Sequence, residues 1–374
     1  DIITVCNALS ANAEMIEYIT NLAAMVPTTA NVNHYANIVK AKSIRRQYIQ
    51  AAKDIIDLSY DGNYDNLTDY RNDILAKVDI PINDEKRETS SISDIALETL
   101  QDIENTKNRS DAERKYYGIK WLDEKTGGAH DGELTILAAR PSVGKTAFAL
   151  QVAINMAFRN NKVAIFSLEM NRRILMKRLI ANLSGVDLQK INYAKDLDEI
   201  DFKAMTEAAA ELAQLPIRIY DKCFRVEEIR GICRELKNAE GIDYVIVDYL
   251  QLCETLKRTA NKNDLVSSMS RTFKLMTLEF DIPIMVLSQL NRENERDNKK
   301  PKLVNLRDSG SIEQDADNVF FLHDEQAGQY SETDIDLPKR IELIIAKQRN
   351  GERNKSHDIA FLLKRQMFKE WAKE

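Results

Sequence analysis

The pattern of hydrophobic and polar residues in the first part of the chain is helical. Apolar residues recur at helical spacing from 31 to 60, with Pro27 just ahead and Asp61-Gly62 just behind. A shorter helical pattern covers 67 to 75. Amphipathic spacing bounded by start and stop signals predicts helices. We therefore expect the first 78 residues to be all-helical.

The pattern changes after Gly118, where short β-branched runs alternate with helical stretches. The predicted strands are LTILAA, VAIFSL, IRIY, YVIVDY, IPIMVLS, NVFFLH and IELIIA. Alternation of this kind predicts an α/β fold, with a mainly parallel sheet and helices on both of its faces.

The segment between these two parts has the composition of an interdomain linker. The stretch VDIPINDEKRETSS is polar and charged, and SISDIALETLQDIEN follows it with a narrow apolar stripe at helical spacing. The stripe consists of Ile92, Ile95, Leu100 and Ile103. A short amphipathic helix must bury such a stripe, either on its own domain or on a neighbouring subunit. The expected domains are a partial helical N-terminal domain (1–78), a linker with a linker helix (79–116) and an α/β domain (117–374).

Composition and charge exclude several other classes of protein. The chain has 374 residues, of which 44% are hydrophobic, and two domains are the natural expectation. The sequence contains no run of 18 apolar residues, so no membrane span is predicted. The N-terminus lacks the pattern of a secretory signal. Asp1 is not an initiator methionine, so we expect the chain to begin partway through a longer protein.

Cysteine spacing and net charge narrow the setting further. The four cysteines are far apart and include no C-x-x-C pair: Cys6, Cys223, Cys233 and Cys253. A disulfide framework or a zinc site is therefore not expected, and the expected location is the reducing cytoplasm. The net charge of -6 means that any contact with DNA must come from local basic loops.

A phosphate-binding loop follows the first predicted strand of the α/β part. LTILAA leads into Arg140-Pro-Ser-Val-Gly-Lys145-Thr146, and the helical pattern AFALQVAINMAF comes next. Backbone N–H groups of such a loop cradle phosphates, while Lys145 reaches the β- and γ-phosphates and the Thr146 hydroxyl holds Mg²⁺. Ala139 stands where the motif has its first glycine. Strand, loop and helix together predict an ATP site.

Two acidic residues end predicted strands near this loop. Glu169 follows VAIFSL, and Asp248 ends YVIVD. A carboxylate at the position of Glu169 can activate the attacking water, although an ordinary capping glutamate fits that position equally well. Asp248 fits the Walker B pattern, in which the carboxylate holds Mg²⁺ through water.

Other strand ends carry an amide and a pair of cations. Gln289 ends IPIMVLSQ and can sense the γ-phosphate, whereas the alternative is a solvent-facing strand end. Lys347 and Arg349 follow IELIIA, and two cations at this spacing point to the same side. They fit an arginine finger, which neutralises charge on the phosphoryl group, and they also fit a basic pair on the surface.

Taken together, these motifs resemble the DnaB-type replicative helicases. The matching segments are LDEKTGGAHDGELTIL (122–137), AARPSVGKT (138–146), FSLEM (166–170), VIVDYLQL (245–252), LSQLNR (287–292), LRDSGSIEQDAD (306–317) and AKQRNG (346–351). VPTTANVNHYANIVKAKSIRRQ (26–47) is similar to the later part of that family's N-terminal domain. The resemblance covers nearly the whole chain, and alanine is usual in the family at the position of Ala139. It implies that 117–374 is a RecA-like P-loop ATPase domain.

The resemblance also implies roles for individual residues. Ser142, Gly144 and Ala147 complete the phosphate loop around Lys145 and Thr146, and Arg178 lies where the family contacts nucleotide. Glu169 becomes the general base, Asp248 the metal partner and Gln289 the γ-phosphate sensor. Lys347 and Arg349 become a finger that reaches the ATP of the adjacent subunit.

The resemblance implies DNA contact and partners as well. Arg307, Asp308 and Gly310 match the family's DNA loop, although the usual residue at 308 is glutamate, one methylene longer. The linker helix is expected to dock on the neighbouring motor domain.

The implied function is a homohexameric helicase that uses ATP and Mg²⁺ to move 5′→3′ on single-stranded DNA, with primase and a helicase loader as partners. A RecA-like recombination or repair ATPase that binds DNA without unwinding it is the alternative. A non-catalytic ring component is disfavoured by the intact Lys145, Glu169, Asp248 and Arg349.

Overall fold

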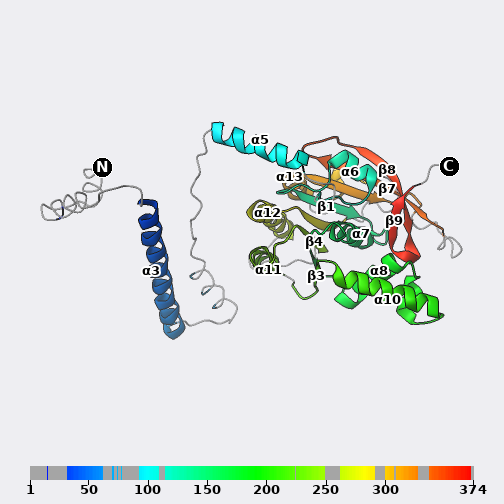
Figure 1. The fold of residues 1–374 in the computed structure, drawn as a ribbon, viewed down its shortest axis with the longest axis horizontal. Coiled ribbons are helices and arrows are strands. Elements are labelled where there is room, and N and C mark those ends of the chain that lie inside the picture. The colour runs from blue at the N-terminus through cyan, green and yellow to red at the C-terminus, as the bar shows by residue number, and fades with distance from the viewer. Residues whose placement is uncertain are drawn as a thin grey trace. The chain divides into compact units, whose positions relative to one another are not determined.

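Two units make up the chain, Asp1–Leu100 and Gln101–Glu374. The computed structural model describes residues 15, 32–61, 70, 74, 77, 92–108, 114–223, 225–248, 262–290, 300–306, 309–326 and 337–371. Figure 1 shows the α/β sheet and its helices within the second unit. No helix among these described residues has the length and apolar character needed to cross a membrane.

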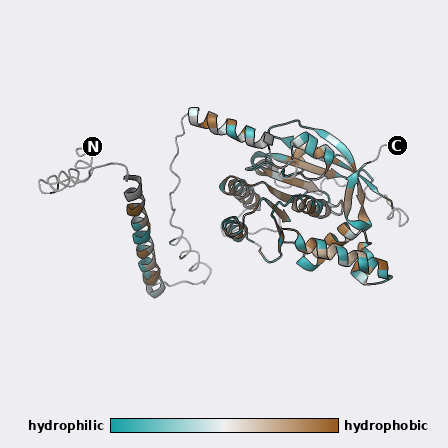
Figure 2. Cartoon of the chain, viewed as in Figure 1, coloured by the Kyte–Doolittle hydropathy of each residue, from teal (hydrophilic) through white to brown (hydrophobic). Residues whose placement is uncertain are grey.

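The described part of the first unit is helical, as predicted. Helix α3 (Val32–Asp61) covers the expected helical stretch. Tyr70, Ile74 and Lys77 also have helical backbone, and the rest of the predicted 67–75 helix lies outside the described residues. Helix α5 (Ile92–Asn108), within which the boundary between the two units falls, contains the predicted linker helix and extends past it. Figure 2 shows hydrophobic and hydrophilic residues interleaved along α5.

The second unit is built on one sheet, which has nine strands within the described ranges, in the order β3-β2-β4-β5-β1-β6-β7-β8-β9. The first six of these positions form parallel pairs, and β7, β8 and β9 continue the sheet in antiparallel pairs. The strands are β1 (Leu134–Ala139), β2 (Val163–Ser167), β3 (Ile217–Tyr220), β4 (Tyr244–Asp248), β5 (Ile284–Gln289), β6 (Asn318–His323), β7 (Lys339–Gln348), β8 (Lys355–Leu362) and β9 (Met367–Glu370). The prediction of a mainly parallel sheet is confirmed.

Helices connect the strands and cover both faces of the sheet. They are α6 (Lys120–Thr126), α7 (Lys145–Ala157), α8 (Arg172–Ser184), α9 (Leu188–Tyr193), α10 (Glu199–Gln214), α11 (Val226–Ala239), α12 (Lys262–Phe280) and α13 (Ser309–Asp315), with short 3-10 helices η4 (Leu303–Asn305) and η6 (Leu363–Arg365). Buried residues of α7 and α8 belong to the hydrophobic cluster on one face, and those of α11 and α12 belong to the cluster on the other.

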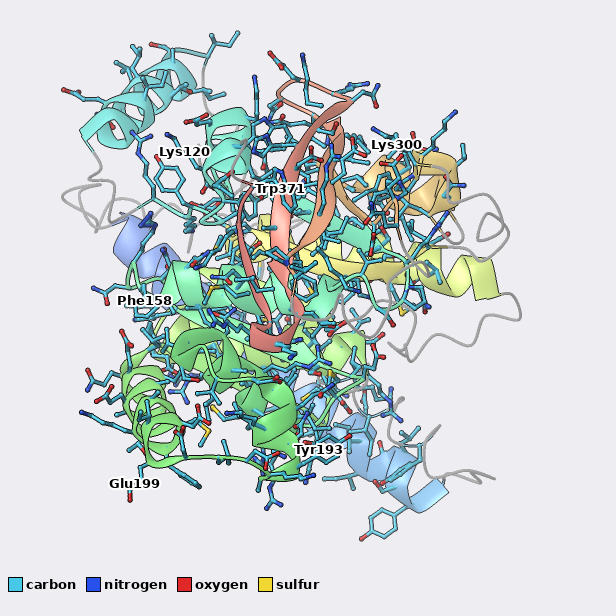
Figure 3. The ribbon with its side chains drawn as sticks, turned by 90° about the vertical axis from the view of Figure 1, so that its right-hand side faces the viewer. Lys120, Phe158, Tyr193, Glu199, Lys300 and Trp371 are labelled. Carbon is cyan, nitrogen blue, oxygen red and sulfur yellow. The ribbon has the colours of Figure 1, made fainter. Side chains whose placement is uncertain are left out.

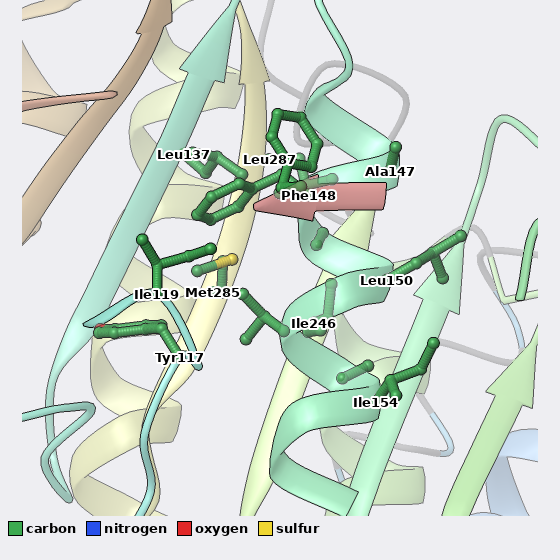
Figure 4. Packing of buried hydrophobic residues seen from close by; sticks show 14 of the residues in the cluster. Tyr117, Ile119, Leu137, Ala147, Phe148, Leu150, Ile154, Ile246, Met285 and Leu287 are labelled. Atoms are coloured by element: carbon green, nitrogen blue, oxygen red, sulfur yellow. The ribbon is translucent and has the colours of Figure 1, made fainter. Parts of the chain in front are cut away.

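Alternation along each strand divides the core between these two faces. In β1, Ile136 packs with the α11–α12 cluster, and its neighbour Leu137 packs with the α7 cluster. Successive strand side chains point to opposite faces, and a strand covered on both faces is apolar throughout. All six residues of β1 are buried. Figure 4 shows Leu137, Phe148, Ile246 and Met285 meeting between the sheet and α7.

Two features differ from the sequence prediction. Strands β8 and β9 were not predicted, because KSHDIAFL mixes exposed polar residues with a few apolar ones and MFKE is very short. Gly310, predicted to lie in a DNA-contacting loop, is in the first turn of helix α13. A seven-residue helix in a polar sequence leaves little periodicity to detect.

Candidate active site

The loop between β1 and α7 has the backbone geometry of an anion-binding loop. Ser142 has φ 66° and Gly144 has φ 106°, both in the left-handed region. A serine there is uncommon and marks a loop that its surroundings hold in place. A Cβ atom at Gly144 would lie 3.0 Å from ring carbons of Phe361 and Phe368, so this position needs glycine for its space as well as its conformation. Turns of this kind aim successive N–H groups at an anion.

A cavity of about 570 Å³ opens beside this loop. Parallel strands end at the same edge of a sheet, and the cavity lies where β1, β2 and β5 end. Its lining includes seven of the residues singled out in the sequence: Ser142, Gly144, Lys145, Thr146, Glu169, Arg178 and Gln289. Gln289 is the parallel partner of Ala139, which sets it beside the start of the loop.

Lys145 lines the cavity, and Asp248 is buried beside it. The Thr146 hydroxyl donates a hydrogen bond to Asp248 Oδ2 at 2.8 Å. Asp248 is 2% exposed, and burial raises its pKa. Burial lowers the pKa of Lys145, opposed by the negative charges of Asp248 and Glu169. A partly buried cation next to two carboxylates suits the binding of a phosphate together with a metal ion.

Two buried polar atoms of this site have no hydrogen-bond partner among the described residues, namely Asp248 Oδ1 and Arg178 Nε. Burial lowers the pKa of the Arg178 guanidinium, again opposed by Asp248 and Glu169. Buried polar groups are normally paired, so both atoms are available to a ligand. A carboxylate oxygen suits Mg²⁺ or its water ligands, and a guanidinium nitrogen suits a phosphate. The site therefore fits ATP with Mg²⁺.

Glu169 and Ala147 differ in their access to this cavity. Glu169 is exposed and lines it two residues beyond the end of β2. Ala147 is 1% exposed, and its side chain packs in the core. Its contribution to a phosphate site is therefore limited to its backbone N–H, in the first turn of α7.

The far wall of the cavity was not predicted from the sequence. It consists of Phe361 from β8, Leu363 from the 3-10 helix η6, and Gln366, which follows that helix. Phe361 stacks on Phe368 at 4.3 Å between ring centroids, and Phe148 of α7 meets Phe368 edge-on at 5.3 Å. The alternation of Ile359 and Phe361 is a weak signal for a strand, but nothing local relates that strand to the phosphate loop.

Lys347 and Arg349 lie at the opposite edge of the sheet, meaning the ends of the strands where β1 starts. Asn318, the first residue of β6, pairs with Thr135 near the start of β1 and with Gln348 at the end of β7. The phosphate loop begins at the other end of β1, after Ala139, about 13 Å away along the strand at ~3.3 Å per residue. The two cations are accordingly not among the residues that line the cavity.

The predicted DNA-contacting residues fall largely outside the described structure. Arg307 and Asp308 lie outside the described residues, and Gly310 is in α13. Leu306, just before them, is buried and pairs with Leu290 in an isolated bridge. That bridge ties the approach to this segment to the end of β5, one residue past Gln289.

A second cavity of similar volume, about 570 Å³, lies over β6, β7 and β8. Figure 3 labels Lys300 and Trp371, which are among its lining residues. Lys300 is paired with Glu342, and Arg340 with Asp358, each at 2.6 Å. Because these charged side chains pair with one another, they are less available to a ligand than the buried, unpartnered atoms near the phosphate loop. We therefore take the phosphate-loop cavity as the active site.

A parallel sheet with a phosphate loop after β1, an acidic residue at the end of β4 and an amide at the end of β5 defines a RecA-like P-loop ATPase. Within that class, the chain belongs to the DnaB-like helicase family. The model of the DnaB-like helicase C terminal domain matches residues 116–370, and that of the N terminal domain matches residues 1–41.

Individual relatives agree with the family match. The chain is 38% identical over 367 residues to the replicative DNA helicase DnaC of Bacillus subtilis (strain 168), covering 94% of this chain and 79% of the relative. It is 39% identical over 368 residues to the replicative DNA helicase DnaB of Geobacillus stearothermophilus, with the same coverage of 94% and 79%.

A solved structure is also similar over the whole chain. It is described as a DnaB-like replicative helicase and its interactions with primase, and it has a TM-score of 0.68 at 30% identity. The match covers 100% of this chain and 88% of that one.

Proposed function

We propose that this chain is the motor subunit of a hexameric replicative helicase, which hydrolyses ATP between adjacent copies and moves 5′→3′ along single-stranded DNA. Its class, an ATP-dependent replicative DNA helicase, is that of its family and its relatives. The finer statements rest on the geometry of the ATPase site and on the family resemblance.

The position of Lys347 and Arg349 is the observation that supports a shared ATP site. They lie beside the start of β1, whereas the phosphate loop follows the end of the same strand. Strands are stiff, so a cation at one edge of the sheet does not reach a phosphate at the other. In a ring of head-to-tail copies, the edge that carries the cations faces the phosphate loop of the next copy. The pair then acts on its neighbour's ATP.

We propose that the phosphate loop binds ATP and Mg²⁺ in the manner of its class. Backbone N–H groups from Ser142 to Ala147 and the Lys145 ammonium hold the phosphates. The Thr146 hydroxyl and Asp248 would hold Mg²⁺, which would neutralise negative charge on the phosphates. The Nε of Arg178, buried without a partner among the described residues, is available to the nucleotide.

Hydrolysis joins a water oxygen to the γ-phosphorus and breaks the bond from that phosphorus to the bridging oxygen of ADP. In the proposed mechanism, Glu169 orients the water and accepts its proton, because its exposed carboxylate lines the cavity. Gln289 senses the γ-phosphate from the end of β5. Lys347 and Arg349 of the adjacent copy neutralise charge that develops on the transferred group.

The proposed contact with DNA follows the segment Arg307, Asp308 and Gly310. A chain with net charge -6 needs a local contact of this kind. Contact with the phosphate backbone suits a motor that must cross any sequence. We further propose primase and a helicase loader as partners and the cytoplasm as the place of action.

Mixing two inactive variants tests the shared site. Lys145→Ala removes the phosphate-loop cation and Arg349→Ala removes the finger, and we expect each protein alone to lose nearly all ATPase activity, since a finger contributes about 10³–10⁵ in rate. Mixed assemblies contain interfaces where an intact Lys145 faces an intact Arg349, so mixing should restore part of the activity.

Exchange of subunits is the control, shown by co-purification of two different tags. If Arg349 acted on the ATP of its own chain, every subunit in the mixture would keep one broken half of its site. Given exchange, no recovery at any mixing ratio would therefore rule out the shared site.

A further inference from the structure

Asp317 is a buried carboxylate on which three elements converge. Its Oδ2 accepts hydrogen bonds from the backbone N–H of Leu134 at 2.8 Å and from Lys274 Nζ at 2.6 Å. Its Oδ1 accepts one from Arg349 Nη1 at 3.2 Å. The Asp317 side chain is 6% exposed. The start of β1, helix α12 and the turn after β7 thus meet on one acidic group.

Lys347, the other cation of the Lys347–Arg349 pair, contacts the chain just before Asp317. Lys347 Nζ donates hydrogen bonds to the carbonyl oxygens of Glu313 at 2.5 Å and Ala316 at 2.6 Å. These carbonyls are at the carboxyl end of α13, where the last carbonyls of a helix lack partners within it and favour a cation. The backbone N–H of Arg349 also donates a hydrogen bond to the backbone carbonyl oxygen of Asp317 at 2.9 Å.

The way Arg349 is held leaves it able to bind a second anion. Its contact with Asp317 uses Nη1, and 63% of its side chain stays exposed. A guanidinium carries five N–H donors in a rigid plane, so fixing one corner orients the remainder. Arg349 is thus both anchored and accessible.

We propose that Asp317 is a positioning residue for ATP hydrolysis: it orients Arg349, and with the end of α13 it fixes the Lys347–Arg349 pair in the direction of the neighbouring copy's ATP. This rests on the proposed shared site. Asp317 touches neither ATP nor its metal ion. It acts through Arg349, whose alignment matters because a displacement of about 1 Å at a reacting group can cost on the order of 10² in rate.

Asp317→Asn tests the proposal selectively. Lys274 and the backbone N–H of Leu134 both donate hydrogen bonds to Oδ2. In the asparagine variant these two donors favour the amide oxygen at that position, so the amide NH₂ group takes the position of Oδ1 and faces Arg349. A donor facing a guanidinium cannot hold it. We expect kcat for ATP hydrolysis to fall about tenfold to a hundredfold. KM for ATP should be unchanged, because the phosphate-loop residues proposed to bind ATP are intact and the finger is proposed to act on charge that develops during the reaction.

Lys274→Met is the matched control. It removes an ion pair from the same carboxylate and leaves the contact with Arg349 in place. If Asp317 merely stabilised the fold, the two variants would lose kcat together. We expect both to have a lowered melting temperature and only Asp317→Asn to lose kcat substantially. Asp317→Glu keeps the charge and moves it by one methylene, so it should have an intermediate kcat. This variant replaces Asp317→Asn as the test if Asp317→Asn does not fold.

Mixing separates this inference from the function on which it rests. Asp317→Asn should be rescued by Lys145→Ala, which supplies an intact finger, and should not be rescued by Arg349→Ala. Failure of Lys145→Ala and Arg349→Ala to rescue each other would refute the shared site itself. If those two do rescue each other, then a wild-type kcat in both Asp317 variants, or a folded Asp317→Asn that Lys145→Ala does not rescue, overturns the role of Asp317.

Discussion

Two carboxylates at one edge of the sheet have environments that suit different tasks. Asp248 is buried, with a raised pKa, and it accepts a hydrogen bond from Thr146. A fixed, desolvated carboxylate suits a metal ion, whose charge offsets the cost of burial. Glu169 is exposed in the cavity, where water has access to it. A general base needs that access, so the exposure of the two carboxylates supports the proposed roles of Glu169 as base and Asp248 as metal partner.

Glu169→Gln should therefore abolish turnover and spare ATP binding. The amide keeps the size of the side chain but cannot accept the proton, and a general base contributes about 10²–10⁴ in rate. The measurements are kcat and the affinity for ATP. Glu207→Gln, an exposed glutamate on α10 and outside the cavity, is the control. Turnover within a few-fold of wild type in Glu169→Gln would show that another group activates the water.

At the residue scale, the sequence was most informative for candidate site residues that come directly after a predicted strand. Lys145, Glu169 and Gln289 each follow a recognisable apolar run, and parallel strands end at one edge, so their convergence was predictable. Phe361 and Asp317 were not singled out, because their roles depend on distant partners. Phe361 reaches the cavity only through the order of strands in the sheet, and Asp317 lies beside Arg349 only because β6 pairs with β7.

At the element scale, the long apolar strands and helices were predictable, and the short or mixed ones were not. Each predicted strand run contains a strand, and α3 and α5 match the helical periodicity. Strands β8 and β9 mix exposed and buried residues. They are stabilised by pairing, β8 with β7 and β9 with β8, which is not a local property. The predicted domain boundaries at 78 and 116 stay predictions.

Helix α5 carries an apolar face that the described residues leave exposed. Ile92 is 87% exposed, Leu100 63% and Ile103 59%. Apolar side chains in such a stripe normally contact a partner. In the proposed hexamer, that partner is the motor unit of an adjacent copy.

Leu100→Glu should therefore weaken assembly, because it places a charge in the middle of the apolar stripe. Gln101→Glu is the matched control, since it adds the same charge one residue later, about 100° around the helix. The measurement is the mass of the assembly with an ATP analogue and single-stranded DNA. We expect smaller species for Leu100→Glu alone. Equal assembly of both variants would mean that this face of α5 is not an interface.

At the scale of the whole molecule, the α/β unit contains both groups of residues that the proposed ATP site requires. The α/β unit carries the phosphate loop at one edge of its sheet and the Lys347–Arg349 pair at the other. In the proposed hexamer, one copy would therefore supply half of two different ATP sites. A closed ring is the arrangement in which every such half meets its complement. The rival reading, a RecA-like ATPase that binds DNA without unwinding it, shares this ATPase geometry and differs in what the motion does to duplex DNA.

Strand displacement tests the central claim most directly. The substrates are duplexes with a single-stranded tail at the 5′ end or at the 3′ end of the strand on which the motor loads, supplied with ATP and Mg²⁺. We expect displacement of the partner strand from the 5′-tailed substrate alone, and none with Lys145→Ala. ATP hydrolysis stimulated by single-stranded DNA, without displacement from either substrate, would contradict it and favour the DNA-binding ATPase.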